Sequence, residues 1–244
     1  AVEEEAHVSE LTRQEMIDRI RAAGVVGAGG AGFPTHVKVD AKVDVVIANG
    51  AECETMVRVD QQEMASRPAD LLRGMEIVMG LTGAAEGVIG LKGKYKTSIA
   101  RLEEQIRLKG LEKSIRIHAM DNYYPAGDEF VLVREVTGKA IPEFGLPLHV
   151  GAVVSNVSTL MDVAGAVDGQ QQVKKRMVTV AGAVVQPGSF RVPVGAPFSA
   201  LVQAAGGSND NSPRLIAGGP MMGSLVEDPE QPVTKVDSMI IVLP

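Results

Sequence analysis

Five glycines stand close together in GVVGAGGAGFPTHVKV, residues 24–39, and one lysine, Lys38, follows them. Backbone amides without side chains can lie against a phosphate or a flat ring, and a lysine adds a positive charge beside them. Pro34 fixes its own φ and favours extended geometry at Phe33, which stiffens the exit of the loop. The segment therefore predicts a binding loop. A flexible connector and an ordinary surface lysine are the alternatives.

A second candidate cluster is NGAECE, residues 49–54, which closes a predicted buried strand. Ligand sites of parallel sheets collect at this end of the strands. Glu52 and Glu54 fall on the same side of an extended segment, where two like charges need a hydrogen-bonding partner such as a ribose hydroxyl or a ring N–H. An exposed acidic turn is the alternative. We expect Cys53 to be a small buried residue, because no histidine or basic residue stands beside it.

Two further clusters combine polar groups with turns. DNYYPAGDEF, residues 121–130, holds Tyr123 and Tyr124, two of the three tyrosines of the chain. In SNVSTL, residues 155–160, a strand passes into a helix. This turn either presents amide and hydroxyl groups to a heterocycle, or Ser155 or Asn156 simply caps the helix. The histidines show no metal-ligand spacing, so we predict no metal site.

Alternating strands and helices position these clusters. The expected elements are a helix over 9–24 with Ser9 as its cap, strands at 43–50, 86–93 and 113–121, helices at 68–84 and 95–110, and a strand ending at 155–156. This order predicts an α/β fold with a Rossmann-like parallel sheet over residues 1–170. A hairpin at 177–194, a helix at 196–207 and strands at 214–219 and 238–244 predict a small β-grasp domain over residues 171–244.

Composition narrows the class of protein. The formal net charge of −6 argues against nucleic acid as a partner. The chain has no apolar run of about 20 residues and no signal-peptide layout, so we expect a cytoplasmic protein without a membrane span. A single cysteine excludes an intrachain disulfide and cannot hold an iron–sulfur cluster, which needs about four thiolates. Because the chain begins with Ala1, we expect a segment that could continue past Pro244.

The four motifs, in this order, resemble the flavoprotein family that includes the NADH-oxidising flavin subunit of respiratory complex I. The sequence is closer to the C subunits of Rnf electron-transport complexes, and closest to the cobalamin reductases of propanediol-utilising microcompartments, where VDQQEM (59–64) also fits. The resemblance implies an oxidoreductase that binds FMN and NADH and passes electrons to an iron–sulfur carrier outside this segment, and on to an acceptor such as cobalamin. It also implies a place inside a bacterial microcompartment or peripheral to a membrane complex.

The same resemblance implies roles for individual residues. Phe33 would frame the NADH site and Lys38 would contact FMN, while Asp128 and Glu129 would orient the cofactors as the catalytic pair. The remaining cofactor-binding residues that it implies are Gly27, Gly29, Gly30, Gly32, Asn49, Glu52, Glu54, Tyr124, Gly127, Ser155, Asn156 and Thr159.

Three positions depart from the pattern of the flavin protein of complex I. Ala28 stands where that pattern has an arginine, Ala51 where it has an aspartate, and Ser155 where it has the first of two asparagines. Ala28 and Ala51 support a second hypothesis, in which the chain is a non-catalytic module that binds a corrinoid or a partner protein of a larger electron-transfer complex.

Overall fold

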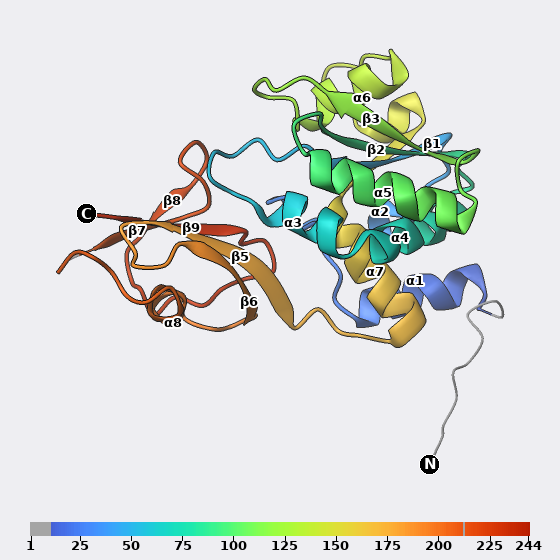
Figure 1. Cartoon of the computed structure of the whole chain (residues 1–244). Coiled ribbons are helices and arrows are strands. Elements are labelled where there is room, and N and C mark those ends of the chain that lie inside the picture. Colours follow the sequence, from blue (N-terminus) through green and yellow to red (C-terminus); the bar gives the residue numbers. More distant parts are fainter. Residues whose placement is uncertain (1–10, 212) are drawn as a thin grey trace.

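Two sheets organise the computed structural model, which describes residues 11–211 and 213–244 (Figure 1). The first sheet has the strand order β3-β2-β1-β4, and every neighbouring pair is parallel. Its strands are β1 (Val45–Gly50), β2 (Glu86–Lys92), β3 (Ile115–Met120) and β4 (Ala152–Asn156). The predicted α/β class with a parallel sheet is therefore confirmed.

Helices cover both faces of this sheet. One face is covered by α1 (Arg13–Ala22), α4 (Pro68–Thr82), α5 (Lys96–Lys109) and α7 (Val157–Gly169) around the larger core. The other face carries α6 (Glu129–Thr137), with Leu132 and Val133 buried against the strands. Two short helices, α2 (Thr35–Lys38) and α3 (Val59–Ser66), follow the glycine loop and the exit of β1. Because both faces are covered, the strands read as continuous apolar runs.

The second sheet has the order β6-β5-β9-β7-β8. Its strands are β5 (Lys175–Gly182), β6 (Gly188–Pro193), β7 (Arg214–Ala217), β8 (Ser224–Val226) and β9 (Met239–Leu243), with helix α8 (Phe198–Ala204) packed beside them. The predicted hairpin is the antiparallel pair β5–β6, and the last strand β9 lies parallel to β5. The domain boundary predicted at residues 170 and 171 falls in the connector between α7 and β5, and it stays a prediction.

Some predicted helix boundaries were wrong, and several short elements escaped prediction. Helix α1 starts at Arg13 because Thr12 accepts the amide of Glu15 while the Glu15 side chain returns to Thr12. The cap predicted at Ser9 lies outside the described residues. Five elements were not predicted, namely α2, α3, α6, β8 and the 3₁₀ helix η2 (Pro147–Val150), and each of them is nine residues long or shorter.

A small apolar cluster joins the second sheet to the segment that leaves β1. Val57 and Val59, from the segment that leaves β1, pack with Ala181, Met239 and Ile241 of the second sheet. The Lys235 Nζ atom donates to the carbonyl oxygen of Gly24 at 2.5 Å, and the Arg176 guanidinium pairs with Asp162 of α7 at 2.6 Å. The second sheet is thus tied directly to the segments that surround the end of β1.

Helix α4 approaches α7 so closely that only glycine fits at one position. A Cβ on Gly74 would overlap the carbonyl oxygen of Leu160, whereas a Cβ on Gly80 of the same helix would have no atom within 4 Å. We expect Gly74→Ala to lower the free energy of unfolding by about 2 kcal/mol or more, because backbone must move. Urea unfolding measures this.

The matched control for that substitution is Gly80→Ala. Alanine favours the helix more than glycine does, so the control should be neutral or stabilising by up to about 1 kcal/mol. Equal destabilisation by both substitutions would contradict the proposed tight contact between α4 and α7.

Candidate functional site

The glycine loop closes on itself. The amide of Gly27 donates to Phe33 O at 2.9 Å, and the amide of Gly32 donates to Gly27 O at 3.2 Å. The amide of Ala28 donates to the Thr159 hydroxyl at 2.9 Å, which fixes the loop to the first turn of α7. Gly30 and Gly32 have φ angles of +107° and +64°, a backbone conformation that glycine adopts without strain. The loop is therefore an ordered turn rather than a flexible connector.

Three consecutive amides at the tip of this loop are unused. Gly29, Gly30 and Ala31 are exposed, and their N–H groups donate to no acceptor among residues 11–211 and 213–244. A Cβ on Gly30 would have no atom within 4 Å, so the space above it is open. Successive free amides form a concave surface that attracts anionic groups. This part of the loop fits the phosphate or the ring of a flavin cofactor.

Phe33 and Lys38 follow the open tip in the chain. The Lys38 ammonium donates to the carbonyl oxygen of Val154 at 2.8 Å, and it lies 3.8 Å from a carboxylate oxygen of Glu129. The Phe33 ring is 47% exposed, which leaves an aromatic face available to a ligand. Lys38 is thus held by β4 and α6 rather than being an ordinary surface lysine.

Asn49 and Gly127, predicted to bind the cofactor, hold two loops together. The Asn49 side chain donates to Gly127 O at 2.8 Å and accepts the amide of Ala51 at 3.1 Å. The amide of Gly127 in turn donates to the Cys53 sulfur at 2.9 Å. A Cβ on Gly127 would overlap the carbonyl oxygen of Ala51, so this position requires glycine. The observed contacts give both residues a structural role.

Two predicted residues act as helix caps. Asp128 Oδ1 accepts the amides of Phe130 and Val131 at the start of α6, at 2.9 and 3.1 Å. Asn156 accepts the amide of Ser158 at the start of α7 and donates to Asp60 at 3.0 Å. The capping alternative is therefore correct for Asn156. For Asp128, the cap fixes the start of α6, and its role in orienting the cofactors stays a prediction.

Thr159 and Ser155, which were also predicted to bind the cofactor, are buried. Thr159 is 2% exposed and its hydroxyl accepts the amide of Ala28, so it positions the glycine loop, and its contact with a cofactor stays a prediction. Ser155 is also buried, and its hydroxyl has no hydrogen-bond partner among the described residues.

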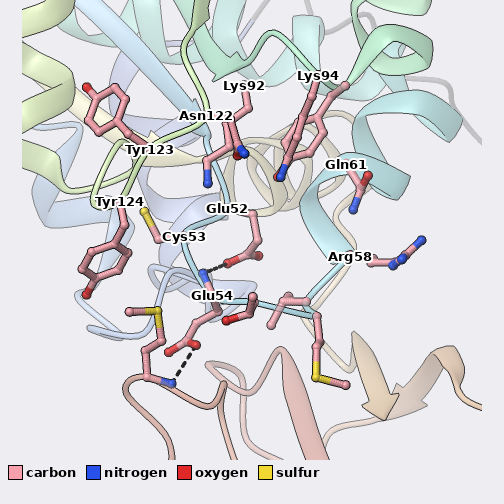
Figure 2. A pocket seen from close by; sticks show the side chains of 15 residues that line it. Glu52, Cys53, Glu54, Arg58, Gln61, Lys92, Lys94, Asn122, Tyr123 and Tyr124 are labelled. Carbon is pink, nitrogen blue, oxygen red and sulfur yellow. Dashed lines mark hydrogen bonds between the residues drawn. The ribbon is translucent and has the colours of Figure 1, made fainter. Parts of the chain in front are cut away.

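The acidic residues after β1 face a cavity of about 530 Å³. Figure 2 shows Glu52 inside it, while Glu54 reaches to the second domain. The Glu54 carboxylate accepts the amides of Met221 and Met222 at 3.1 and 2.7 Å, so its partner is backbone rather than the ribose or ring N–H that we expected. The cavity is lined by Glu52, Cys53, Glu54, Thr55, Met56, Val57, Arg58, Gln61, Lys92, Lys94, Tyr95, Asn122, Tyr123, Tyr124 and Met221.

The structure therefore divides the predicted residues between two places. Glu52, Glu54 and Tyr124 line the cavity, whereas the glycine loop, Lys38, Asn156 and Thr159 do not. Sequence reasoning missed Lys92, Lys94 and Asn122. Their signal was the position of Lys92 and Asn122 at the carboxyl ends of β2 and β3, where ligand sites collect.

Burial controls the charge of the cavity wall. The pKa of Glu52 is raised to about 7, chiefly by burial and also by the neighbouring Glu54 charge, while hydrogen bonds from the backbone and the Lys92 charge act to lower it. Burial and then the Glu52 charge raise the pKa of Asp60 well above its usual value. Burial, followed by the charges of Glu52 and Asp60, raises the pKa of Tyr95 to about 12. Glu52 is thus neither an exposed nor an ordinary carboxylate.

Within residues 11–211 and 213–244, no three His, Cys, Asp or Glu residues are grouped so that they could hold a metal ion. Over the same residues, every helix is too short or too polar to cross a bilayer.

Comparisons with known proteins bear on both domains. Residues 20–165 match the family model described as the Nuo51 FMN-binding domain, and residues 177–224 match the SLBB domain. The chain is 45% identical to a cobalamin reductase PduS of Salmonella typhimurium over 96% of this chain and 51% of the relative. It is 34% identical to the C subunit of the Na(+)-translocating ferredoxin:NAD(+) oxidoreductase complex of Acetobacterium woodii, over 91% of this chain and 50% of the relative.

A solved structure shares the fold. An NAD+-reducing NiFe hydrogenase superposes with a TM-score of 0.81 at 22% identity, covering 99% of this chain and 49% of that one. The chain thus spans about half the length of the curated relatives that it matches.

Glu52 makes stability depend on pH. Its pKa is about 7 in the folded chain, against a usual 4.5, so the folded state binds more protons between these values. The contribution of Glu52 to stability therefore falls as the pH rises through that window. Glu52→Gln should leave stability nearly unchanged at about pH 4 and raise the free energy of unfolding by about 1–3 kcal/mol at about pH 8. Urea unfolding at both pH values tests this.

The control is Glu143→Gln, at an exposed position remote from the cavity lining. Its stability difference from the parent chain should not change between the two pH values. A flat difference for Glu52→Gln as well would show that this carboxyl titrates normally.

Proposed function

The chain belongs to the Nuo51 FMN-binding domain family and carries an SLBB domain after it, and on this premise we propose that it binds FMN at the glycine loop and oxidises NADH. The observation that carries the proposal is the row of three free, exposed amides at Gly29, Gly30 and Ala31. FMN, when bound, supplies a group that accepts a hydride and releases electrons singly.

The residues of the chain would bind and orient the cofactors. The free amides would hold an anionic or carbonyl oxygen of the cofactor, and Lys38 would add a positive charge beside it. Phe33 would cover an aromatic ring, because its side chain is half exposed next to the loop. Glu129 would fix the position of Lys38 through their ion pair. Holding donor and acceptor in contact is what the protein contributes to the rate.

The proposal also covers the electron acceptor and the cellular location. We propose an iron–sulfur carrier as the next partner and cobalamin as an acceptor, which the name of the relative at 45% identity supports. The relative at 34% identity is named for ferredoxin and NAD(+), which supports the nicotinamide part of the proposal. We propose a cytoplasmic location, within a microcompartment or beside a membrane complex.

One observation favours a second candidate function. The carboxylate of Glu54, implied to serve the flavin, is occupied by two amides of the second domain. Together with Ala28 and Ala51, this favours a non-catalytic module that binds a corrinoid or a partner protein. Such a module would remain colourless with FMN and would change the spectrum of added cobalamin.

Flavin retention tests the proposed function. After incubation with FMN and desalting, the protein should keep the flavin absorbance near 450 nm, a band of the cofactor itself. NADH should then bleach this band in a stopped-flow experiment. Lys38→Met should weaken FMN binding by about tenfold or more, because a charge-assisted contact is lost.

Lys42→Met is the matched control, since Lys42 is exposed and makes no ion pair within the described residues. It should keep the affinity of the parent chain. A folded parent chain that retains no FMN would contradict the proposed function, and retained FMN that NADH does not bleach would contradict the NADH step alone.

A further inference from the structure

A second cavity, of about 570 Å³, lies between α7 and the hairpin β5–β6. Its wall is formed by Arg67 at the junction of α3 and α4, one side of α7, the connector at 170–174, the start of β5, and Arg191 of β6. The connector runs from the end of α7 to β5, as Figure 1 shows. None of these wall residues belongs to the glycine loop or lines the cavity beside Glu52. The second cavity is therefore distinct from the proposed flavin site.

Positive charge dominates the wall of this second cavity. Its charged residues are four cations and a single carboxylate, namely Arg67, Lys174, Lys175, Arg191 and Asp162. The register of the hairpin brings two of the cations together. Arg191 lies opposite Met177, and Met177 stands two residues after Lys175 in β5, so Lys175 and Arg191 leave the same face of the sheet.

The one carboxylate of the wall already has a partner. Asp162 accepts a hydrogen bond from the Arg176 guanidinium at 2.6 Å. Arg176 is buried, and its Nη2 atom still lacks a hydrogen-bond partner among the residues that the structure describes. Asp162 is therefore committed to a cation behind the wall and does not balance the cations that face the cavity.

Three cations of the wall have no counter-charge of their own. Lys174, Lys175 and Arg191 are exposed, and their side chains make no hydrogen bond or ion pair with any residue in the described part of the chain. Like charges that line one cavity repel one another, and a bound anion would remove that repulsion. Arg67 differs from them, because it pairs with carboxylates of α3 and α4.

The uncharged part of the wall suits a small and highly charged ligand. The connector contributes three consecutive glutamines at 170–172, whose side-chain amides can donate hydrogen bonds. Met161 and Val173 are the apolar side chains, other than glycine, that the described residues contribute. A flat apolar ring would therefore find little surface to pack against here.

We propose that this second cavity binds a small polyanion, a compound with two or more carboxylate or phosphate groups, through Lys174, Lys175 and Arg191. The Arg191 guanidinium can hold a carboxylate or a phosphate by two parallel hydrogen bonds, and the lysines add point charges. The volume of about 570 Å³ lies in the range of small-molecule sites, which occur preferentially between domains. This site is additional to the FMN and NADH sites, and it does not rest on the proposed function.

Calorimetric titration of the whole chain with citrate and with pyrophosphate tests the proposal. At low ionic strength each probe should bind at one site, with an affinity that weakens as KCl is added, because salt screens the attraction. Lys175→Met and Arg191→Met should each weaken binding by about tenfold or more, since each removes a charge-assisted hydrogen bond. Both side chains are exposed, so neither substitution removes a buried contact. The probe that binds more tightly identifies carboxylate or phosphate as the preferred group.

Arg214→Met is the matched control for these variants. Arg214 is an exposed strand arginine of the same sheet, and it lies outside the wall of the second cavity. The substitution changes the net charge equally, and the variant should bind both probes like the parent chain. Equal weakening by Arg214→Met would mean diffuse attraction to surface charge and would overturn the proposal.

Cofactor competition separates this site from the proposed flavin site. The FMN-loaded chain should bind citrate and pyrophosphate with unchanged affinity, and NADH should not displace them. Displacement by either cofactor would place the polyanion in the cofactor site and overturn the proposal. A folded parent chain that binds neither probe would overturn it as well, whether or not the chain retains FMN.

Discussion

The close approach of Gly127 to Ala51 is the constraint on which the candidate site depends. The glycine leaves no room for a side chain against the carbonyl oxygen of Ala51, and Asn49 and Cys53 fasten the same two loops with side-chain contacts. These contacts fix the path of the segment that leaves β1. That course sets the direction of Glu52 and Glu54 and brings Val57 and Val59 to the second sheet.

The path of this segment also explains how the fold accommodates the carboxyl groups of Glu52, Glu54 and Asp60. The Glu54 carboxylate accepts hydrogen bonds from two backbone amides of the second domain, while Asp60 accepts one from the side-chain amide of Asn156. Glu52 has weaker support, because the amide of Glu54 donates to it over 3.3 Å and the backbone of Cys53 adds little. Burial is the main cause of its raised pKa, and these hydrogen bonds offset burial only in part. Lys92, at the end of β2, lines the same cavity, and its charge lowers the pKa of Glu52 by less than the Glu54 charge raises it.

The sequence predicted the elements whose signal is local. Continuous apolar runs identified β1 and β2 within two residues at each end, and the glycine loop was identified from residues that follow one another in the chain. Short elements such as α3 were missed, since an eight-residue helix with four buried residues carries little periodicity. Contacts between residues that are distant in the chain could not be predicted from local sequence patterns. Glu54 accepts the amides of Met221 and Met222, which lie more than 160 residues away in the chain, and the cavity beside Glu52 is formed by the segment after β1, the end of β2 and the loop after β3.

The contact between the second domain and the glycine loop bears on how such proteins can be recombined. Lys235 holds the carbonyl oxygen of Gly24 at one end of the loop, and Val236 lies beside Gly32 at the other, so that even an added methyl group would crowd it. A chimera joined at the connector between α7 and β5 would combine the glycine loop of one parent with the Lys235–Val236 segment of the other. Exchange of domains between relatives therefore has to carry the matching pair of segments together, although more than 200 residues separate Gly24 from Lys235.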